Sequence, residues 1–131
     1  MIKLSKLLFL QLSYVFIGVS YLLLSAYQLQ ETGQALSAAP ILPAIIGFVL
    51  YSGFLLLPRI GMIKSYRFAM FLAIILMGGG GVVGNIVRYM DSGLEHYANF
   101  LAFAIAVAIN SYGTVLNTIA ALGLFKNSAK N

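Results

Sequence analysis

The sequence predicts an all-α integral membrane protein in which a single transmembrane domain, residues 1–131, forms a four-helix bundle. Hydrophobic residues make up 61% of the chain and charged residues only 8%, whereas a soluble domain has about 25% charged residues. In addition, four apolar runs approach or exceed about 20 residues, the helix length that crosses about 30 Å of hydrocarbon. The expected spans are residues 7–27, 41–57, 68–90 and 100–125.

The positions of the basic residues orient this bundle. Every Lys and Arg except Arg88 lies before the first span, between the second and third spans, or after the fourth span. Because positively charged loops stay in the cytoplasm, both termini are expected to be cytoplasmic and the loops at residues 28–40 and 91–99 external. We expect a multi-pass protein of a bacterial inner membrane, in contact with the lipid bilayer. The topology also accounts for the net charge of +5 without a nucleic-acid partner.

Two absences from the sequence narrow the chemistry. The chain has no cysteine, which excludes disulfides, thiolate chemistry and cysteine-ligated metal or iron–sulfur centres. Between the basic flanks and Arg88, no span contains an ionisable Asp, Glu, Lys, Arg or His, although proton-coupled carriers commonly place one in the membrane. The pattern argues against a proton-coupled pump, and no cofactor is expected.

The first span carries a regular row of polar and small residues. Its members are Gln11, Tyr14, Gly18, Tyr21, Ser25 and Gln28, at spacings of 3, 4, 3, 4 and 3 residues. This is the heptad period of a left-handed helix pair, and such side chains turn toward neighbouring helices in a membrane. We expect the row to face protein, as a packing seam or, alternatively, as the lining of a polar cavity.

Prolines delimit the second span, which is the shortest of the four. Pro40 or Pro43 stands in its first turn, where amide donors lack helical partners, and Pro58 ends it. Gly47 and Tyr51 mark the face on which this helix is expected to pack.

The third span contains four consecutive glycines, Gly78–Gly81. Gly81 falls on a face that continues through Gly84 to Arg88, and Gly80 and Gly84 form a pair of small residues four apart. Such pairs let two helix backbones approach closely. The run favours a tight helix crossing, with a kink or a locally unwound segment as the alternatives.

The fourth span repeats the pattern of small and polar residues. Asn110 and Asn117 are seven residues apart and share a helix face. Across the chain, the candidate helix-packing residues are Gly18, Gly80, Gly81, Gly84, Ala102, Ala106 and Gly113. The candidate residues of a polar path are Tyr14, Tyr21, Asn85, Asn110 and Asn117.

A cluster of ionisable residues stands at the external end of the third span. Its members are Arg88, Asp91, Glu95 and His96. A histidine beside carboxylates can transfer protons or bind a divalent metal weakly, and an arginine at a groove mouth can hold a carboxylate or phosphate. The spacing matches no metal motif, so no metal is expected. The simpler interpretation is a solvated loop with an ion pair between Arg88 and Asp91.

Three classes of function remain open. The sequence favours a non-catalytic accessory or structural subunit of a membrane assembly, because the first, third and fourth spans carry more small-residue surface than one minimal bundle buries. The first alternative is a self-associating, uncoupled carrier, pore or lipid-handling protein. The second is a membrane enzyme with its site at the outer interface. The expected partners are other membrane subunits or further copies of this chain.

Overall fold

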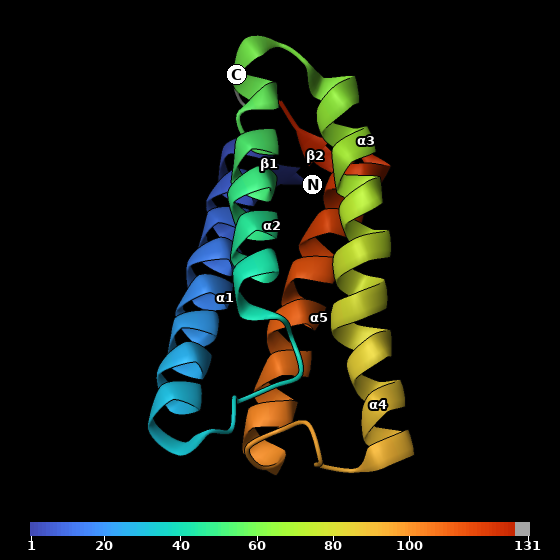
Figure 1. The fold of residues 1–131 in the computed structure, drawn as a ribbon. Helices are drawn as coiled ribbons and strands as arrows, with labels where there is room; N and C mark the ends of the chain where they lie inside the picture. Colours follow the sequence, from blue (N-terminus) through green and yellow to red (C-terminus); the bar gives the residue numbers. More distant parts are fainter. Residues whose placement is uncertain (128–131) are drawn as a thin grey trace.

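Long apolar helices form the body of the molecule, as the sequence predicts. The computed structural model describes residues 1–127 and arranges them as an elongated bundle (Figure 1). Its helical elements are α1 (Leu4–Thr32), α2 (Ile41–Phe54), the 3₁₀-helix η1 (Leu57–Ile60), α3 (Ile63–Ala73), the π-helix η2 (Ile74–Val83), α4 (Gly84–Ser92) and α5 (Phe100–Leu122). Within these residues, four helical stretches are long and apolar enough to cross a membrane: Leu4–Thr32, Ile41–Ile60, Ile63–Ser92 and Phe100–Leu122. The predicted bundle of four long apolar helices is confirmed.

Local sequence signals set the ends of the helices. α1 ends at Gly33, whose φ of 79° is left-handed and whose amide donates to the Leu29 carbonyl oxygen at 2.8 Å. Residues with a β-carbon rarely adopt this conformation, which makes glycine the usual residue at such an end. α5 begins at Asn99, whose Oδ1 accepts a hydrogen bond from the Ala102 amide at 2.8 Å. That bond satisfies one of the amides that a first helical turn leaves without a partner.

The glycine run of the third span forms a π-helix and stays helical throughout. In η2, backbone hydrogen bonds join residues five apart, and the Gly84 amide accordingly donates to the Gly79 carbonyl. Gly78 and Gly81 face α5, and a β-carbon on Gly81 would overlap the side chain of Asn110. The run therefore brings the third span close to α5, with a π-helical backbone that the residue pattern did not predict.

Two short parallel strands join the ends of the first and fourth spans. β1 (Ile2–Lys3) pairs with β2 (Phe125–Lys126), with Ile2 opposite Phe125. The sequence predicted basic flanks here and extended the fourth span to Phe125, whereas α5 ends at Leu122 and Phe125 lies in a strand. The pairing holds the start of α1 beside the end of α5 (Figure 1). We call this the strand end of the molecule, and the opposite end, with connections 33–40 and 93–99, the loop end.

The helix α2 stands apart from much of the third span. α2 packs on α1 and touches α3 only lightly, whereas α5 packs on α1, α3 and η2. Toward the loop end, α2 and the η2–α4 stretch diverge, with α5 behind them (Figure 1).

The core centres on Tyr14, which is fully buried. Its ring meets the rings of Phe48 and Tyr51 edge to face, with centroids 5.2 Å and 5.6 Å away. On the α5 side it lies against Gly113, where a β-carbon would come closer than 3.0 Å to the ring. The absence of a side chain at Gly113 is thus what lets α1 and α5 close around this tyrosine.

Gly113→Ala tests this contact. The added methyl must displace a buried ring, and overpacking of this kind costs about 1–3 kcal/mol, so the unfolding midpoint in mild detergent should fall. Gly47→Ala is the matched control, because a β-carbon there meets nothing within 4 Å. Equal midpoints for the two variants would show that Gly113 does not limit the approach of the helices.

Candidate functional site

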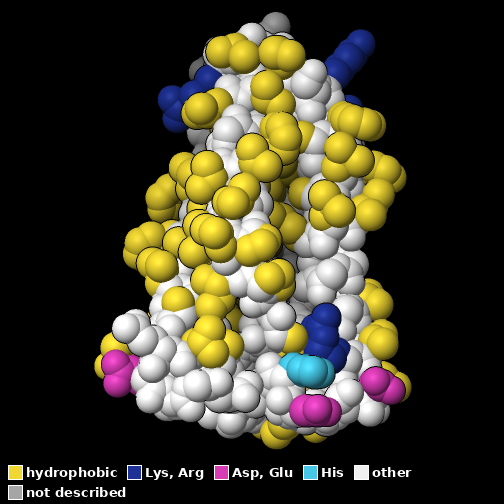
Figure 2. Space-filling view, viewed as in Figure 1, with side chains coloured by type: hydrophobic (Ala, Val, Ile, Leu, Met, Phe, Trp, Pro, Cys, Tyr) yellow, Lys and Arg dark blue, Asp and Glu magenta, His cyan; other side chains and the backbone are white. Residues whose placement is uncertain are grey.

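A lateral groove lies between α2 on one side and η2 and α4 on the other. Its volume is about 660 Å³, within the range of pockets that hold small ligands. Residues of α1 and α5 form its floor, and its edges are exposed apolar side chains such as Leu50 on α2 and Leu76 on η2. Hydrophobic side chains cover this face of the bundle, whereas charged side chains gather at its two ends (Figure 2).

Polar groups line the groove where it reaches the loop end. They are Ser37, from the connection after α1, and Asn85 and Arg88 from α4. Ser37 and Asn85 are buried, and Arg88 is half-buried. Away from this end the lining is mostly apolar, with Asn110 and tyrosines among it, so the groove combines a largely apolar wall with a polar end that includes a cation.

Arg88 is held by two neutral side chains. Its Nη1 donates to Asn85 Oδ1 at 3.2 Å and to the Tyr97 hydroxyl at 3.3 Å. The Tyr97 hydroxyl in turn donates to Asn85 Oδ1 at 2.7 Å, and its ring meets Phe103 edge to face. We call Asn85, Arg88 and Tyr97 the loop-end cluster. Its chemistry is that of a fixed cation with hydrogen-bond donors, which suits an anion or another acceptor.

The acidic and histidine residues predicted beside Arg88 do not join this cluster. Asp91 Oδ2 accepts a hydrogen bond from Ser92 Oγ at 3.3 Å, and Glu95 and His96 are exposed. In the described part of the chain, Arg88 forms no ion pair, and no three His, Asp or Glu side chains are grouped to hold a metal. Arg88 thus bonds neutral groups, although its spacing from Asp91 would permit an ion pair.

A second polar cluster joins all four spans nearer the strand end. Each span contributes one buried side chain: Gln11 from α1, Tyr51 from α2, Tyr66 from α3 and Asn117 from α5. Gln11 Nε2 donates to Asn117 Oδ1 at 3.1 Å, while Tyr66 donates to Gln11 Oε1 and Tyr51 to Asn117 Oδ1. We call these four residues the four-helix network.

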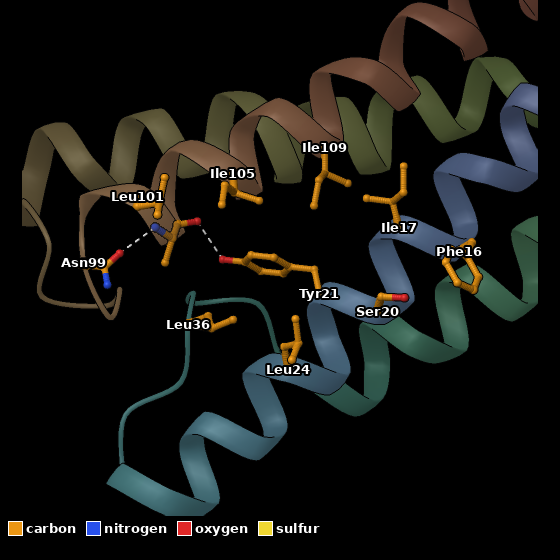
Figure 3. Close-up of a pocket in the computed structure, with 11 residues that line it drawn as sticks. Phe16, Ile17, Ser20, Tyr21, Leu24, Leu36, Asn99, Leu101, Ile105 and Ile109 are labelled. Carbon is orange, nitrogen blue, oxygen red and sulfur yellow. Dashed lines mark hydrogen bonds between the residues drawn. The ribbon is translucent and has the colours of Figure 1, made fainter.

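The other residues of the predicted polar path bond elsewhere. The Tyr14 hydroxyl points to Met77 Sδ at 3.5 Å, and Asn110 Nδ2 donates to the Ala106 carbonyl of its own helix. Tyr21 reaches from α1 to α5 and donates to the Ala102 carbonyl at 2.8 Å (Figure 3). No continuous hydrogen-bonded path within residues 1–127 therefore joins the predicted residues Tyr14, Tyr21, Asn85, Asn110 and Asn117.

A shallower depression lies beside Tyr21, on the outside of α1 and α5 (Figure 3). Its volume is about 420 Å³, and apolar side chains such as Phe16, Ile105 and Ile109 line it. Two of the polar groups shown there have partners, because Tyr21 bonds Ala102 and Asn99 Oδ1 caps α5 (Figure 3). This depression offers no charged group to a ligand.

The predicted packing residues fall into three groups. Gly18, Gly81 and Gly113 each face a side chain of another helix so closely that a β-carbon would overlap it. Ala102 and Ala106 are buried on α5. Gly80 lines the groove with nothing within 4 Å of a β-carbon, and a β-carbon on Gly84 would meet only the Gly79 carbonyl of its own helix. The Gly80–Gly84 pair therefore does not contact a neighbouring helix in this structure.

The sequence did not single out three tyrosines as site residues: Tyr51, Tyr66 and Tyr97. Each donates its hydroxyl to a carboxamide oxygen on a different segment. The sequence does contain one signal that such partners exist. The apolar spans include Gln11, Asn85 and Asn117, and each buried amide needs hydrogen-bond partners. The identity of the partner depends on which helix faces it, and spacing along one helix does not reveal that.

Comparison with protein-family models, with curated proteins and with solved structures finds no match for this chain.

Gln11→Leu tests the four-helix network. Losing the amide leaves the Tyr66 hydroxyl and Asn117 without their shared partner, and an unsatisfied buried polar group costs about 1–3 kcal/mol. The unfolding midpoint in detergent should fall, whereas Gln30→Leu, at an exposed position of the same helix, should leave it nearly unchanged. A Gln11→Leu protein as stable as the wild type would mean that these bonds do not hold the spans together.

Proposed function

We propose that this chain is a lipid-handling membrane protein that admits an amphiphile into its lateral groove. The observation that carries the proposal is the polarity of the groove, which is mostly apolar along its walls and polar, with Arg88, at the loop end. An amphiphile has the same profile, with a hydrocarbon tail and a polar head. The exposed apolar edges at Leu50 and Leu76 would lie in the bilayer, so that a tail can enter sideways without crossing water.

The packing near the strand end supports lipid handling over a pore. Gln11, Tyr14, Tyr66 and Asn117 are each fully buried, and they fill the centre of the bundle from side to side. A pore needs a polar path through the whole bundle, whereas the groove opens sideways. Of the carrier, pore and lipid-handling alternatives raised by the sequence, the last therefore has the most support.

The proposed orientation places the strand end in the cytoplasm of a bacterial cell. Lys3, Lys6, Arg59, Lys64, Arg67 and Lys126 all lie at or near the strand end, and positive loops remain cytoplasmic. Loops 28–40 and 91–99 are then external. In this orientation the polar end of the groove is at the outer leaflet of the inner membrane.

A second candidate function is that of an accessory subunit, with a helix of a partner or of another copy lying in the groove. Gly47 on α2 and Gly80 on η2 both line the groove and have nothing within 4 Å of a β-carbon. Small residues of this kind let a further helix approach closely. A cation at one end favours the amphiphile, since an apolar helix leaves Arg88 without an anion.

Cysteine labelling tests the orientation, because the chain has no cysteine of its own. Gln34 lies in the first loop-end connection and Ser65 near the strand end, and both are exposed. In intact spheroplasts, a membrane-impermeant maleimide should label Gln34→Cys, and should label Ser65→Cys only after permeabilisation. The reverse pattern would invert the proposed topology.

A leucine at Gly80 tests the groove as a lipid site. Its side chain would occupy the groove, and native mass spectrometry from mixed-lipid nanodiscs should then show much less retained lipid than the wild type. Gly79→Leu is the matched control: Gly79 is also exposed and free of neighbours within 4 Å, but it does not line the groove.

The same spectra distinguish the two candidate functions. Equal lipid retention by the two leucine variants would exclude the groove as the lipid site. A stoichiometric protein partner that is lost only with Gly80→Leu would assign the groove to the accessory-subunit function.

A further inference from the structure

We propose that the amphiphile carries an anionic headgroup, a phosphate or a carboxylate, and that Arg88 binds it. This inference rests on the proposed function, because it identifies the head of the molecule whose tail occupies the groove. Four observations carry it: the unpaired charge of Arg88, its free donors, its rigid support and its position.

The charge of Arg88 is not compensated within residues 1–127. No carboxylate lies within 4.0 Å of it, and both of its hydrogen-bond partners are neutral. Asp91, three residues further along the helix, bonds Ser92 instead. A cation partly withdrawn from water is stabilised by a nearby anion, and a bound anionic headgroup would supply one.

The free donors of Arg88 suit an anion with two oxygens. All of its hydrogen bonds in the described chain leave from Nη1. A guanidinium has five N–H donors in a planar fork, so Nε and Nη2 remain for a ligand. This pair of donors is the kind that binds carboxylate or phosphate in bidentate fashion.

The support beneath Arg88 is rigid. Asn85 Nδ2 donates to the Gly81 carbonyl at 2.6 Å, and Asn85 Oδ1 also accepts from the buried Tyr97. These bonds fix the oxygen that holds Arg88 without neutralising the charge. Positioning by neutral groups leaves the guanidinium available and limits the entropy that a ligand must remove.

The position of Arg88 separates it from an ordinary interfacial arginine. Many arginines near helix ends extend to lipid headgroups of the bulk bilayer. Arg88 instead lines the same groove as Gly80, Gly81 and the floor residues of α1 and α5. A headgroup on Arg88 would thus belong to a molecule whose tail is in the groove, and selectivity for anionic lipid should depend on both features.

The experiment uses full-length protein in nanodiscs that contain equal amounts of phosphatidylglycerol and phosphatidylcholine. After release into the gas phase, native mass spectrometry measures the ratio of the two lipids that stay bound. The wild type should retain phosphatidylglycerol over phosphatidylcholine by about fivefold, the effect of one cation near a membrane surface. A parallel series with oleate tests the carboxylate form of the same headgroup chemistry.

Three arginine variants test the assignment. Arg88→Gln should retain lipid but reduce the ratio to about one, and Arg88→Lys should keep a smaller preference because it keeps the charge without the fork. Arg59→Gln, at an exposed arginine in η1 near the strand end, is the control and should match the wild type. A wild-type ratio in Arg88→Gln, with a normal unfolding midpoint, would overturn the inference.

Two further outcomes separate this inference from the proposed function. Lipid lost with Gly80→Leu, together with a ratio near one in the wild type, would keep the lipid groove and remove the anionic headgroup. No retained lipid in any protein would remove both. Inorganic phosphate tests the other source of the anion: if the lipid ratio of the wild type is near one without phosphate, and the wild type but not Arg88→Gln retains phosphate, Arg88 binds a free anion and the headgroup assignment is wrong.

Discussion

One hydrogen-bonded network, at a single level of the bundle, determines how the four spans are arranged. Lipid tails are as apolar as leucine, so helices in a membrane gain little from hydrophobic burial, and specific contacts select their arrangement. Gln11 and Asn117 at the centre connect α1 and α5, and Tyr51 and Tyr66 attach α2 and α3. Each such bond contributes only about 0.6 kcal/mol on average, and Asn117 Nδ2 has no hydrogen-bond partner among the described residues. The network thus specifies the arrangement more than it stabilises it. Tyr51 lies near the end of α2, and the groove runs along this helix from Pro40 to Phe54.

The glycine run determines the opposite wall of the groove. Gly78 and Gly81 face α5, whereas Gly80 faces the open space. In water each glycine would cost a helix about 1 kcal/mol relative to alanine, but backbone at membrane depth has to stay hydrogen-bonded, which favours a helical form. The π-helix meets this requirement with hydrogen bonds between residues five apart. The wall formed by Gly80 continues into α4, where Asn85 and Arg88 also line the groove.

The sequence predicts the four spans well, but it identifies only some residues of the candidate site. Hydropathy finds the four spans because crossing a bilayer requires long apolar runs, and the amides of Gln11, Asn85 and Asn117 mark buried polar positions. The sequence does not identify the partners of these amides. Periodicity assigns Tyr51 to a face of its own helix, but its contact with Asn117 depends on how α2 and α5 are placed in space. The sequence does not predict the π-helix either, since four glycines are compatible with a tight helix crossing, a kink or an unwound segment. The predicted ion pair of Arg88 does not form for a different reason. Helical spacing favoured Asp91 as the partner, whereas the chain after α4 brings Tyr97 back to Arg88.

Two arginines in the third span show why the loop end is the place to look for function. Arg67 donates from Nε to the Ala121 carbonyl at 3.1 Å, at the C-terminal end of α5, where unpaired carbonyls and the helix dipole attract a cation. The contact joins the third span to the fourth. Arg88 also bonds only neutral groups, Asn85 and Tyr97, but it lines the groove, which Arg67 does not. A fold that needed Arg88 only for stability could compensate it with Asp91, which is three residues away. The charge is instead left at the polar end of an apolar groove, where an anion that enters with a hydrocarbon tail would supply the missing partner.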